Sequence, residues 1–396
     1  MHHSPKQVRQ PEGDLSAVLS SDALAADLPD MNTIMNKIIR WYRENRRSLP
    51  WRDNPTPYTT WIAEIMLQQT RIEAVIPYYH RFLHELPDIP SLAEVPEDRL
   101  LKLWEGLGYY SRARNLKKAA GLVVQQHGGM LPASVAELKK LPGIGDYTAG
   151  SIASIAFGLP EPAVDGNVLR VISRLLASSE DIMLPATRKR VTELLRGHYP
   201  AGEDAGLLTE GLMELGETVC LPNSAPRCES CPVASLCLAH GVGNELNYPV
   251  KAEAKERRIE NRTILLLRQG ARFAIRKRPA KGLLAGLWEF PGLDGHLDEE
   301  TVARMFPQAA VRPAGKSKHI FTHVEWHMLG YLVSLSEGEA IPAGCGLMQI
   351  DSLSEGESPE SSLSSDDIVW KTPEEIDASY SLPTAFRYYK NRLSTL

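Results

Sequence analysis

The sequence has few cysteines, and most of them lie together. Only five occur in 396 residues, and four of these, Cys220, Cys228, Cys231 and Cys237, fall within one short stretch. An odd number of clustered thiols argues against a disulfide framework and fits a reducing compartment. Cys345 is isolated, and we assign it no role.

Long apolar runs are also missing. No stretch approaches the roughly 20 apolar residues that a membrane helix needs, and the opening residues, MHHSPKQVRQPEGDLS, lack the apolar core of a signal peptide. These absences predict a cytoplasmic protein with no membrane partner. Strong charge is absent too, because the net charge is only −5. Nucleic-acid binding would therefore need a local basic patch, and the overall charge does not exclude one.

The length and the change in composition along the chain predict two domains. Apolar residues recur at three- and four-residue steps through 31–240, which predicts a helical domain. A polar stretch at 241–260 is typical of a linker, and strand-like alternation then predicts an α/β or α+β domain over 261–396. We expect residues 1–30 to form a mobile tail and the Ser- and Glu-rich stretch 352–367 to form a solvated loop.

The cysteine spacing, C-x7-C-x2-C-x5-C, has a chemical explanation rather than a packing one. Four thiolates from one short loop can surround a tetrahedral zinc ion or a cubic iron–sulfur cluster. The spacing alone leaves both possibilities open.

A glycine-rich turn lies about 75 residues upstream, in SVAELKKLPGIGDYTAG. The pattern predicts a helix, a tight turn and a second helix. Gly143 and Gly145 permit positive φ and a close approach by another backbone, and the amides that begin the second helix suit a phosphate. An ordinary helix–helix turn is the alternative.

Two carboxylates are candidate catalytic groups. Asp165 lies in AVDGNVLRV and is either a helix N-cap or a catalytic group. Glu64 lies in PYTTWIAEIMLQQT, where Trp61 and Leu67 share its helix face together with Thr60 and Gln68. Desolvation there raises the pKa of a carboxyl group, which is what a general acid needs. A surface glutamate on a half-buried helix is the alternative.

Together these segments resemble the helix-hairpin-helix DNA glycosylase superfamily, and WIAEIMLQQT resembles the signature of MutY-type adenine glycosylases. The resemblance implies a mainly α helix-hairpin-helix glycosylase core with a 4Fe–4S loop at 220–237, followed by an α+β Nudix-like domain. It implies one 4Fe–4S cluster on the four clustered cysteines, with structural zinc as the alternative. The family has six residues in the first cysteine gap, and we expect the seventh residue here, in LPNSAPR, to bulge outwards.

The resemblance also implies roles for the carboxylates. Glu64 would protonate the adenine, and Asp165 would stabilise the oxocarbenium ion or form a covalent intermediate, as paired carboxylates do in glycosidases. Bifunctional members attack the sugar with a lysine just after the hairpin. This chain has Tyr147 there, and a phenol cannot form a Schiff base, so the enzyme should be monofunctional. Tyr147 and Asn167 are expected to orient Asp165.

Further residues are assigned to DNA by the same resemblance. Flipping a base out of the duplex costs a few kcal/mol, and wedge side chains offset that cost. For the apolar wedge candidates a core role is the alternative. The wedge candidates are Gln69, Thr70, Leu107 and Tyr109, and the candidates for the adenine pocket are Arg47, Leu49, Trp51, Arg52 and Glu210.

The second domain resembles the entry to a Nudix hydrolase at 278–292 but lacks the R-E-x-x-E-E residues that hold magnesium. We therefore expect a binding domain without hydrolase activity. Phe321, Thr322 and His323 match the loop with which the family contacts 8-oxoguanine, and a plain strand is the alternative. Lys316 and Lys318 would suit nearby phosphates.

The sequence thus predicts a monomeric, monofunctional DNA glycosylase of base excision repair. Its partner would be double-stranded DNA in which adenine is mispaired with 8-oxoguanine or guanine. We expect it in the cytoplasm, and with the nucleoid if the source is prokaryotic. The rivals are an endonuclease III-like glycosylase/lyase, a non-catalytic damage-binding protein and a Nudix nucleotide hydrolase.

Overall fold

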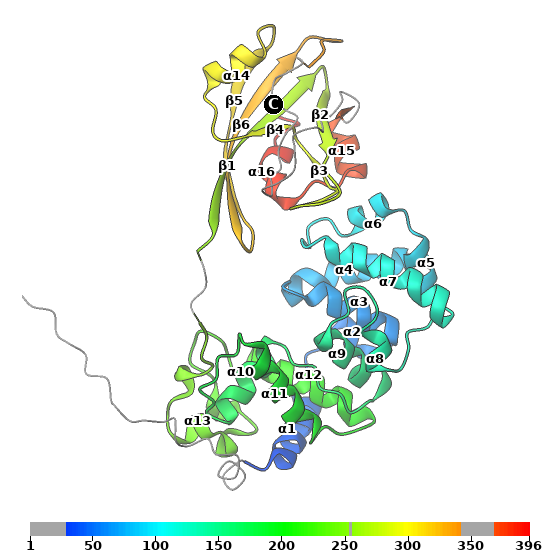
Figure 1. Cartoon of the computed structure of the whole chain (residues 1–396), viewed down its shortest axis with the longest axis vertical. Helices are drawn as coiled ribbons and strands as arrows, with labels where there is room; N and C mark the ends of the chain where they lie inside the picture. Colours follow the sequence, from blue (N-terminus) through cyan, green and yellow to red (C-terminus); the bar gives the residue numbers. More distant parts are fainter. Residues whose placement is uncertain (1–28, 253–255, 342–367) are drawn as a thin grey trace, which may run out of the picture. The chain divides into compact units, whose positions relative to one another are not determined.

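The computed structural model describes residues 29–252, 256–341 and 368–396 (Figure 1). The chain forms two compact units: the first contains Met1–Ser48 and Asp146–Ala252, and the second contains Leu49–Gly145 and Glu253–Leu396. The predicted helical stretch is therefore divided between both units. The predicted loop at 352–367 and nearly all of the predicted tail lie outside the described residues. The predicted limits of the two domains stay a prediction.

The first unit packs helices around a shared apolar core. In α1 (Met31–Asn45), apolar side chains at three- and four-residue steps, including Ile34, Ile38 and Tyr42, are fully buried. Asp30 caps this helix by accepting a hydrogen bond from the Asn32 amide. The other helical elements are α9 (Asp146–Phe157), α10 (Gly166–Leu175), α11 (Pro185–Arg196), α12 (Glu203–Thr218), α13 (Leu238–Gly241), η2 (Cys228–Ser230), η3 (Ala234–Leu236) and η4 (Glu245–Asn247).

The second unit begins with seven helices. In α3 (Pro57–Leu67), Thr56 and Thr59 form a capping box and Pro57 occupies the first turn, which fixes where the helix starts. Most of its side chains are buried, because the helix is apolar nearly all the way round. The others are α2 (Pro50–Asp53), α4 (Ile72–Glu85), α5 (Ile89–Glu94), α6 (Glu97–Leu103), α7 (Ser111–His127) and α8 (Val135–Leu138).

A mixed sheet and the helices that cover it form the rest of the second unit. Its order is β3-β2-β1-β6-β5, with β4 paired to β1 and β7 paired to β2. The central β1 runs parallel to β6, and the other pairings are antiparallel. The strands are β1 (Arg258–Gln269), β2 (Arg272–Lys277), β3 (Trp288–Glu289), β4 (Gly292–Asp294), β5 (Ala310–Ile320), β6 (Val324–Leu335) and β7 (Ile368–Lys371).

Helices cover both faces of this sheet (Figure 1). On one face, α14 (Glu299–Met305) contributes Val302 to a core with alternate residues of β1 and β6. On the other, α15 (Pro373–Ser379), η6 (Thr384–Phe386) and α16 (Arg387–Lys390) pack against Trp326. Helices on an otherwise strand-based domain confirm the expected α+β class, and the helices listed above confirm the mainly α part.

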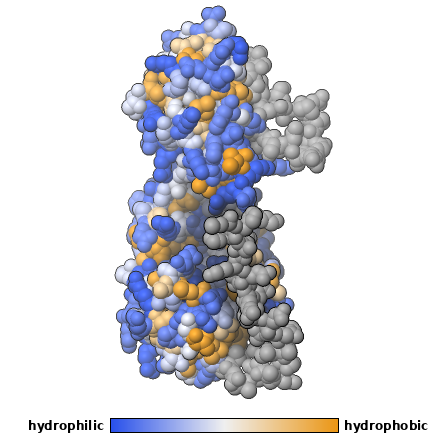
Figure 2. All heavy atoms as spheres, turned by 90° about the vertical axis from the view of Figure 1, so that its left-hand side faces the viewer, coloured by the Kyte–Doolittle hydropathy of each residue, from blue (hydrophilic) through white to orange (hydrophobic). Residues whose placement is uncertain are grey.

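Among the described residues, none of the helices has the length and apolarity to cross a bilayer. On the face drawn in Figure 2, small groups of hydrophobic residues are interrupted by hydrophilic ones. Scattered exposed apolar side chains of this kind are normal for a protein surface.

Candidate functional site

Glu64 lies near the C-terminal end of α3 and is buried, with 7% of its surface exposed. Its neighbours one turn earlier, Thr60 and Trp61, are buried as well. Burial removes water from a carboxyl group and favours its neutral form. The burial expected around Glu64 is therefore present, and its role as a general acid stays a prediction.

The predicted pocket residues belong to both units. In the second unit, Leu49 and Trp51 are buried, and the Trp51 ring packs edge-on against Tyr79 with ring centroids 5.5 Å apart. Arg52 is half-buried beside them on α2. Leu49 and Trp51 thus belong to the apolar core at the start of this unit.

Arg47 and Glu210 belong to the first unit. The Arg47 Nε atom lies 2.5 Å from Glu214 Oε1, and its Nη2 atom lies 2.5 Å from Glu217 Oε2. These carboxylates raise the pKa of Arg47 above its ordinary value. Glu210 accepts a hydrogen bond of 2.9 Å from the Tyr42 hydroxyl group. Sequence reasoning missed Glu214, because this residue and Arg47 lie 167 positions apart in the sequence.

The predicted wedge residues lie in two loops of the second unit. Gln69 and Tyr109 are exposed, and both have left-handed backbones, with φ of 57° and 46°. Thr70 is half-buried, and Leu107 is buried. Gln69 and Tyr109 are therefore the two that are available to a ligand.

The hairpin at 141–145 joins α8 to α9. Gly143 has φ of 81°, and a Cβ atom there would lie 2.8 Å from Asn115 Cβ, so only glycine fits without strain. Gly145 does not have a left-handed φ, and a Cβ atom would meet nothing within 4 Å. Both glycines are exposed, whereas Ile144 between them is buried.

Asp165 is the N-cap of α10, so the structural role considered for it is real. Its Oδ1 atom accepts a hydrogen bond of 2.8 Å from the Val168 amide. The hydrogen bond expected from Asn167 is also present, at 2.9 Å from Asn167 Nδ2 to Asp165 Oδ2. An N-cap can still serve chemistry, since these contacts fix the orientation of the carboxylate.

Arg170 extends this arrangement, and sequence reasoning did not find it. It is buried, and it donates to Asn167 Oδ1 at 2.9 Å and to the Cys220 carbonyl at 2.9 Å. Burial raises the pKa of Asp165, while the Val168 and Asn167 hydrogen bonds and the Arg170 charge act in the opposite direction. A series of hydrogen bonds through Arg170 and Asn167 thus connects the Cys220 carbonyl group in the cysteine loop to the candidate catalytic carboxylate of Asp165.

Tyr147 lies in the first turn of α9 and is half-buried. Its hydroxyl group lies 3.6 Å from Met213 Sδ on α12.

The four clustered cysteines are half-buried free thiols that line one hollow, with Val171 and Leu215 at its apolar side. Burial raises the pKa of the Cys231 thiol to about 11 and of the Cys228 thiol to about 12. Arg174 donates from Nη1 to Cys220 Sγ at 3.3 Å. In the long first gap, residues 222–225 are exposed, as expected for an outward bulge.

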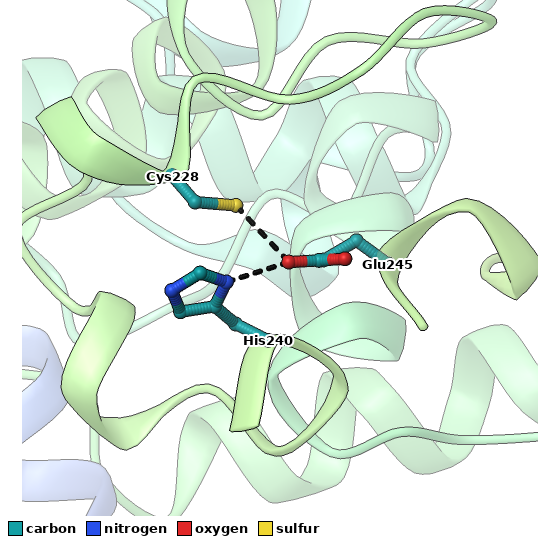
Figure 3. Close-up of side chains that lie close together, drawn as sticks. All are labelled: Cys228, His240 and Glu245. Atoms are coloured by element: carbon teal, nitrogen blue, oxygen red, sulfur yellow. Dashed lines mark hydrogen bonds and ion pairs between the residues drawn. The ribbon is translucent and has the colours of Figure 1, made fainter. Parts of the chain in front are cut away.

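Figure 3 shows that His240 and Glu245, which line the same hollow, lie close to the Cys228 thiol. His240 Nδ1 lies 2.5 Å from Glu245 Oε1, and the Cys228 thiol lies 3.6 Å from the same oxygen. The ligand atoms of these three residues lie within 4.8 Å of one another. Sequence reasoning did not single out His240 or Glu245, because neither belongs to a recognisable spacing.

Residues 321–323 connect β5 to β6, so the segment is a tight loop and not a continuous strand. The Phe321 amide donates to the Val324 carbonyl at 2.8 Å and closes the turn. The Phe321 ring packs edge-on against Trp326 with centroids 4.9 Å apart. Thr322 and His323 are exposed.

Thr322 also contacts the helical part of its own unit. Its Oγ1 atom lies 2.7 Å from the Tyr109 hydroxyl group. Lys316 is exposed, and Lys318 forms an ion pair with Glu325. The loop predicted to contact 8-oxoguanine therefore touches Tyr109, which is predicted to act as a wedge in the same duplex.

Two family models match the chain. The model of the HhH-GPD superfamily base excision DNA repair proteins matches residues 62–198, and the NUDIX domain model matches residues 263–392. The fold and the site thus define a DNA glycosylase, an enzyme that hydrolyses N-glycosyl bonds, with a Nudix-like domain after its helical part.

Relatives of known activity narrow the class. The adenine DNA glycosylase of Homo sapiens is 33% identical over 383 residues, which cover 80% of this chain and 70% of the human protein. That of Mus musculus is 31% identical, covering 84% and 76%. That of Buchnera aphidicola subsp. Schizaphis graminum is 32% identical, covering 76% and 87%. The chain belongs to the adenine DNA glycosylase family, and it acts on adenine in DNA during base excision repair.

Proposed function

We propose that this enzyme is a monomeric, monofunctional glycosylase that removes adenine mispaired with 8-oxoguanine or guanine. Glu64 is the general acid, and Asp165 stabilises the positive sugar or captures it in a covalent intermediate. The observation that supports the substrate is the 2.7 Å contact between Tyr109 and Thr322. It brings the residue assigned to the wedge next to the residue assigned to the oxidised base.

The two carboxyl groups divide the work because their surroundings differ. Glu64 is buried on an apolar helix, which favours the protonated form that adenine needs as it leaves. Burial raises the pKa of Asp165, and the hydrogen bonds that it accepts from Val168 and Asn167 oppose this effect and favour its ionised form. Water then completes hydrolysis, with Glu64, now ionised, as the base.

Tyr147 supports hydrolysis without strand cleavage. A Schiff base requires an amine, and a phenol at this position provides none. Borohydride should therefore trap no covalent adduct between the enzyme and DNA. A trapped adduct would favour an endonuclease III-like lyase instead.

The cysteine hollow fits a 4Fe–4S cluster better than a single zinc ion. Four thiolates around zinc, each about 2.3 Å from the metal, would place their sulfur atoms about 3.8 Å apart. Among the described residues, the ligand atoms that gather within 4.8 Å include only one of the four thiols, Cys228. The four thiols that line one hollow, Cys220, Cys228, Cys231 and Cys237, would instead hold a 4Fe–4S cluster, which would brace the loop between α12 and η4.

Iron analysis tests the cluster directly. The purified protein should be yellow-brown and should contain about four irons per chain, as a single 4Fe–4S cluster requires. Colourless protein with one zinc ion would contradict the assignment.

Duplexes that differ only in the base opposite adenine test the substrate. Excision should be fastest opposite 8-oxoguanine, and Thr322→Val should reduce this preference while adenine opposite guanine is still removed. Lys281→Met, at an exposed position in the same domain, is the matched control. An unchanged preference in Thr322→Val would contradict the role of the loop.

A further inference from the structure

Arg112 lies in the first turn of α7 and is buried, with 8% of its surface exposed. Its guanidinium group reaches the end of α3. The Nη1 atom donates to the carbonyl oxygens of Ile65, Met66 and Gln68 at 2.7, 3.0 and 2.7 Å. These carbonyl groups at a helix end have no partner within the helix, so Arg112 serves as their cap.

The other side of the guanidinium group reaches a second segment. The Nη2 atom donates to the carbonyl oxygens of Leu107 and Gly108 at 2.9 and 3.1 Å. It also lies 3.3 Å from Thr70 Oγ1. One planar side chain therefore joins the α3–α4 loop (residues 68–71) to the α6–α7 loop (residues 104–110).

Each of these loops carries a residue with a strained backbone. Gln69 has φ of 57° and Tyr109 has φ of 46°, although neither is glycine. Side chains other than glycine rarely adopt this region, and they persist there only where the surroundings hold them. The fixed carbonyl groups of Gln68 and Gly108, one residue before each strained position, supply that hold.

Two aromatic rings also pack against Arg112. The Arg112 guanidinium carbon lies 5.3 Å from the ring centroid of Trp104 and 5.6 Å from that of Tyr109. Burial lowers the pKa of Arg112 to about 10, so the group stays charged at neutral pH. Hydrogen bonds from a charged donor are stronger than those from a neutral one, and the two rings add cation–π attraction.

We propose that Arg112 is a positioning residue for base extrusion, which holds the exposed Gln69 and Tyr109 side chains in one rigid frame. The inference rests on the proposed function, in which both residues enter the DNA. A rigid frame matters because wedge groups must fill the gap left by the flipped base, and a misplaced group loses that contact.

Lysine cannot replace arginine here. Its three donors share one nitrogen atom, whereas the guanidinium group has separate nitrogen atoms that face the two loops. Arg112→Lys keeps the charge and should hold at most one loop, and Arg112→Met should hold neither. Arg81→Met is the matched control, because Arg81 also donates to a carbonyl group, that of Leu103, and stacks on a tyrosine, Tyr78.

Hydrogen–deuterium exchange of the free full-length proteins tests the frame without any activity. Amides of both loops should exchange faster in Arg112→Met and Arg112→Lys, with the rest of the chain unchanged, and Arg81→Met should match the wild type. Unchanged exchange in either loop would overturn the proposal. So would loss of the whole fold in both variants, because Arg112 would then be a general core residue.

Base extrusion is followed with 2-aminopurine beside the target adenine in an 8-oxoguanine duplex. The Arg112 variants should lose the fluorescence rise on binding and slow single-turnover excision by about tenfold or more, a typical effect of misplacement near a reacting group. Duplex affinity should fall less than the excision rate. A normal fluorescence rise in both variants would contradict the proposal, whereas a wild-type enzyme that releases no adenine would contradict only the proposed function.

Discussion

At the scale of single residues, the two carboxyl groups are distinguished by what surrounds them. Glu64 sits among buried side chains of α3, and Asp165 is held by an amide and by Asn167. Burial favours the neutral form of both groups, and at Asp165 the hydrogen-bond donors and the Arg170 charge oppose it. The same chemical group can thus act as an acid in one place and stabilise a cation in another.

Replacing Glu64 by glutamine should separate binding from chemistry. Glu64→Gln keeps the size of the side chain and removes its acidic proton, so excision should fall by about 10²–10⁴-fold, the range for general acid–base catalysis. Binding to mispaired DNA should persist, as measured by gel shift. Glu73→Gln, at an exposed position on α4, is the control. Undiminished excision in Glu64→Gln would refute the acid assignment.

Removing the Asn167 amide should change the pH dependence of excision. The Asn167 hydrogen bond lowers the pKa of Asp165 against the raising effect of burial. In Asn167→Leu that pKa therefore rises further, and the ionised form is lost at a higher pH. The acid limb of the rate profile should shift to higher pH, while the alkaline limb stays in place. A shift to lower pH would show that Asp165 does not set this limb.

The residues that motif reasoning found and missed have a physical explanation. Asp165 and Asn167 are two positions apart, so their contact is visible in the sequence. Arg170 meets the Cys220 carbonyl 50 positions away, and Arg112 meets the Ile65 carbonyl 47 positions away. Such contacts exist only after folding, and an arginine in a helix carries no local signal of them.

At the scale of elements, the hairpin depends on two glycines for different reasons. Gly143→Ala should destabilise the protein by about 1–2 kcal/mol, because it forces a side chain into a left-handed backbone and against Asn115. Gly145→Ala meets no neighbour and should leave stability within about 0.5 kcal/mol. It should still weaken DNA binding if the hairpin grips a phosphate backbone. Thermal unfolding and binding assays separate the two effects, and equal stability loss in both variants would contradict this account.

Some elements could be predicted from the sequence and others could not. The helices α1, α3, α4, α6 and α7 follow the apolar periodicity that predicts a helical domain over 31–240. The strand β5 carries a weaker local signal, because Pro313 and Gly315 lie inside it, with a register shift between them. The short β7 and α15 follow the undescribed segment and owe their place to the sheet and core they join.

At the scale of the whole molecule, a charge network ties α6 to the last helices within the second unit. Lys390 lies 3.2 Å from Glu105 and 2.9 Å from Asp377, and Lys102 lies 2.5 Å from Glu105. Lys102 also donates to the Tyr380 carbonyl. The Tyr109–Thr322 contact also joins the helical part of this unit to its sheet.

Breaking this network should weaken the Tyr109–Thr322 contact more than it destabilises the fold. Lys390→Met should lower the free energy of unfolding by about 1–3 kcal/mol, because it removes one ion-pair partner from the mostly buried Glu105 carboxylate. The preference for 8-oxoguanine over guanine should fall, since Thr322 would meet Tyr109 less often. Lys189→Met, which removes an exposed pair on α11, is the control. A full preference in Lys390→Met would show that the network does not position the loop.

The most direct test of the account is an excision assay on matched duplexes that carry adenine opposite 8-oxoguanine, guanine, cytosine or thymine. Alkali is added afterwards to cut abasic sites. We predict cleavage of the adenine strand only after alkali, fastest opposite 8-oxoguanine. Adenine excision with no dependence on the opposite base, or cleavage of the strand before alkali, would contradict it.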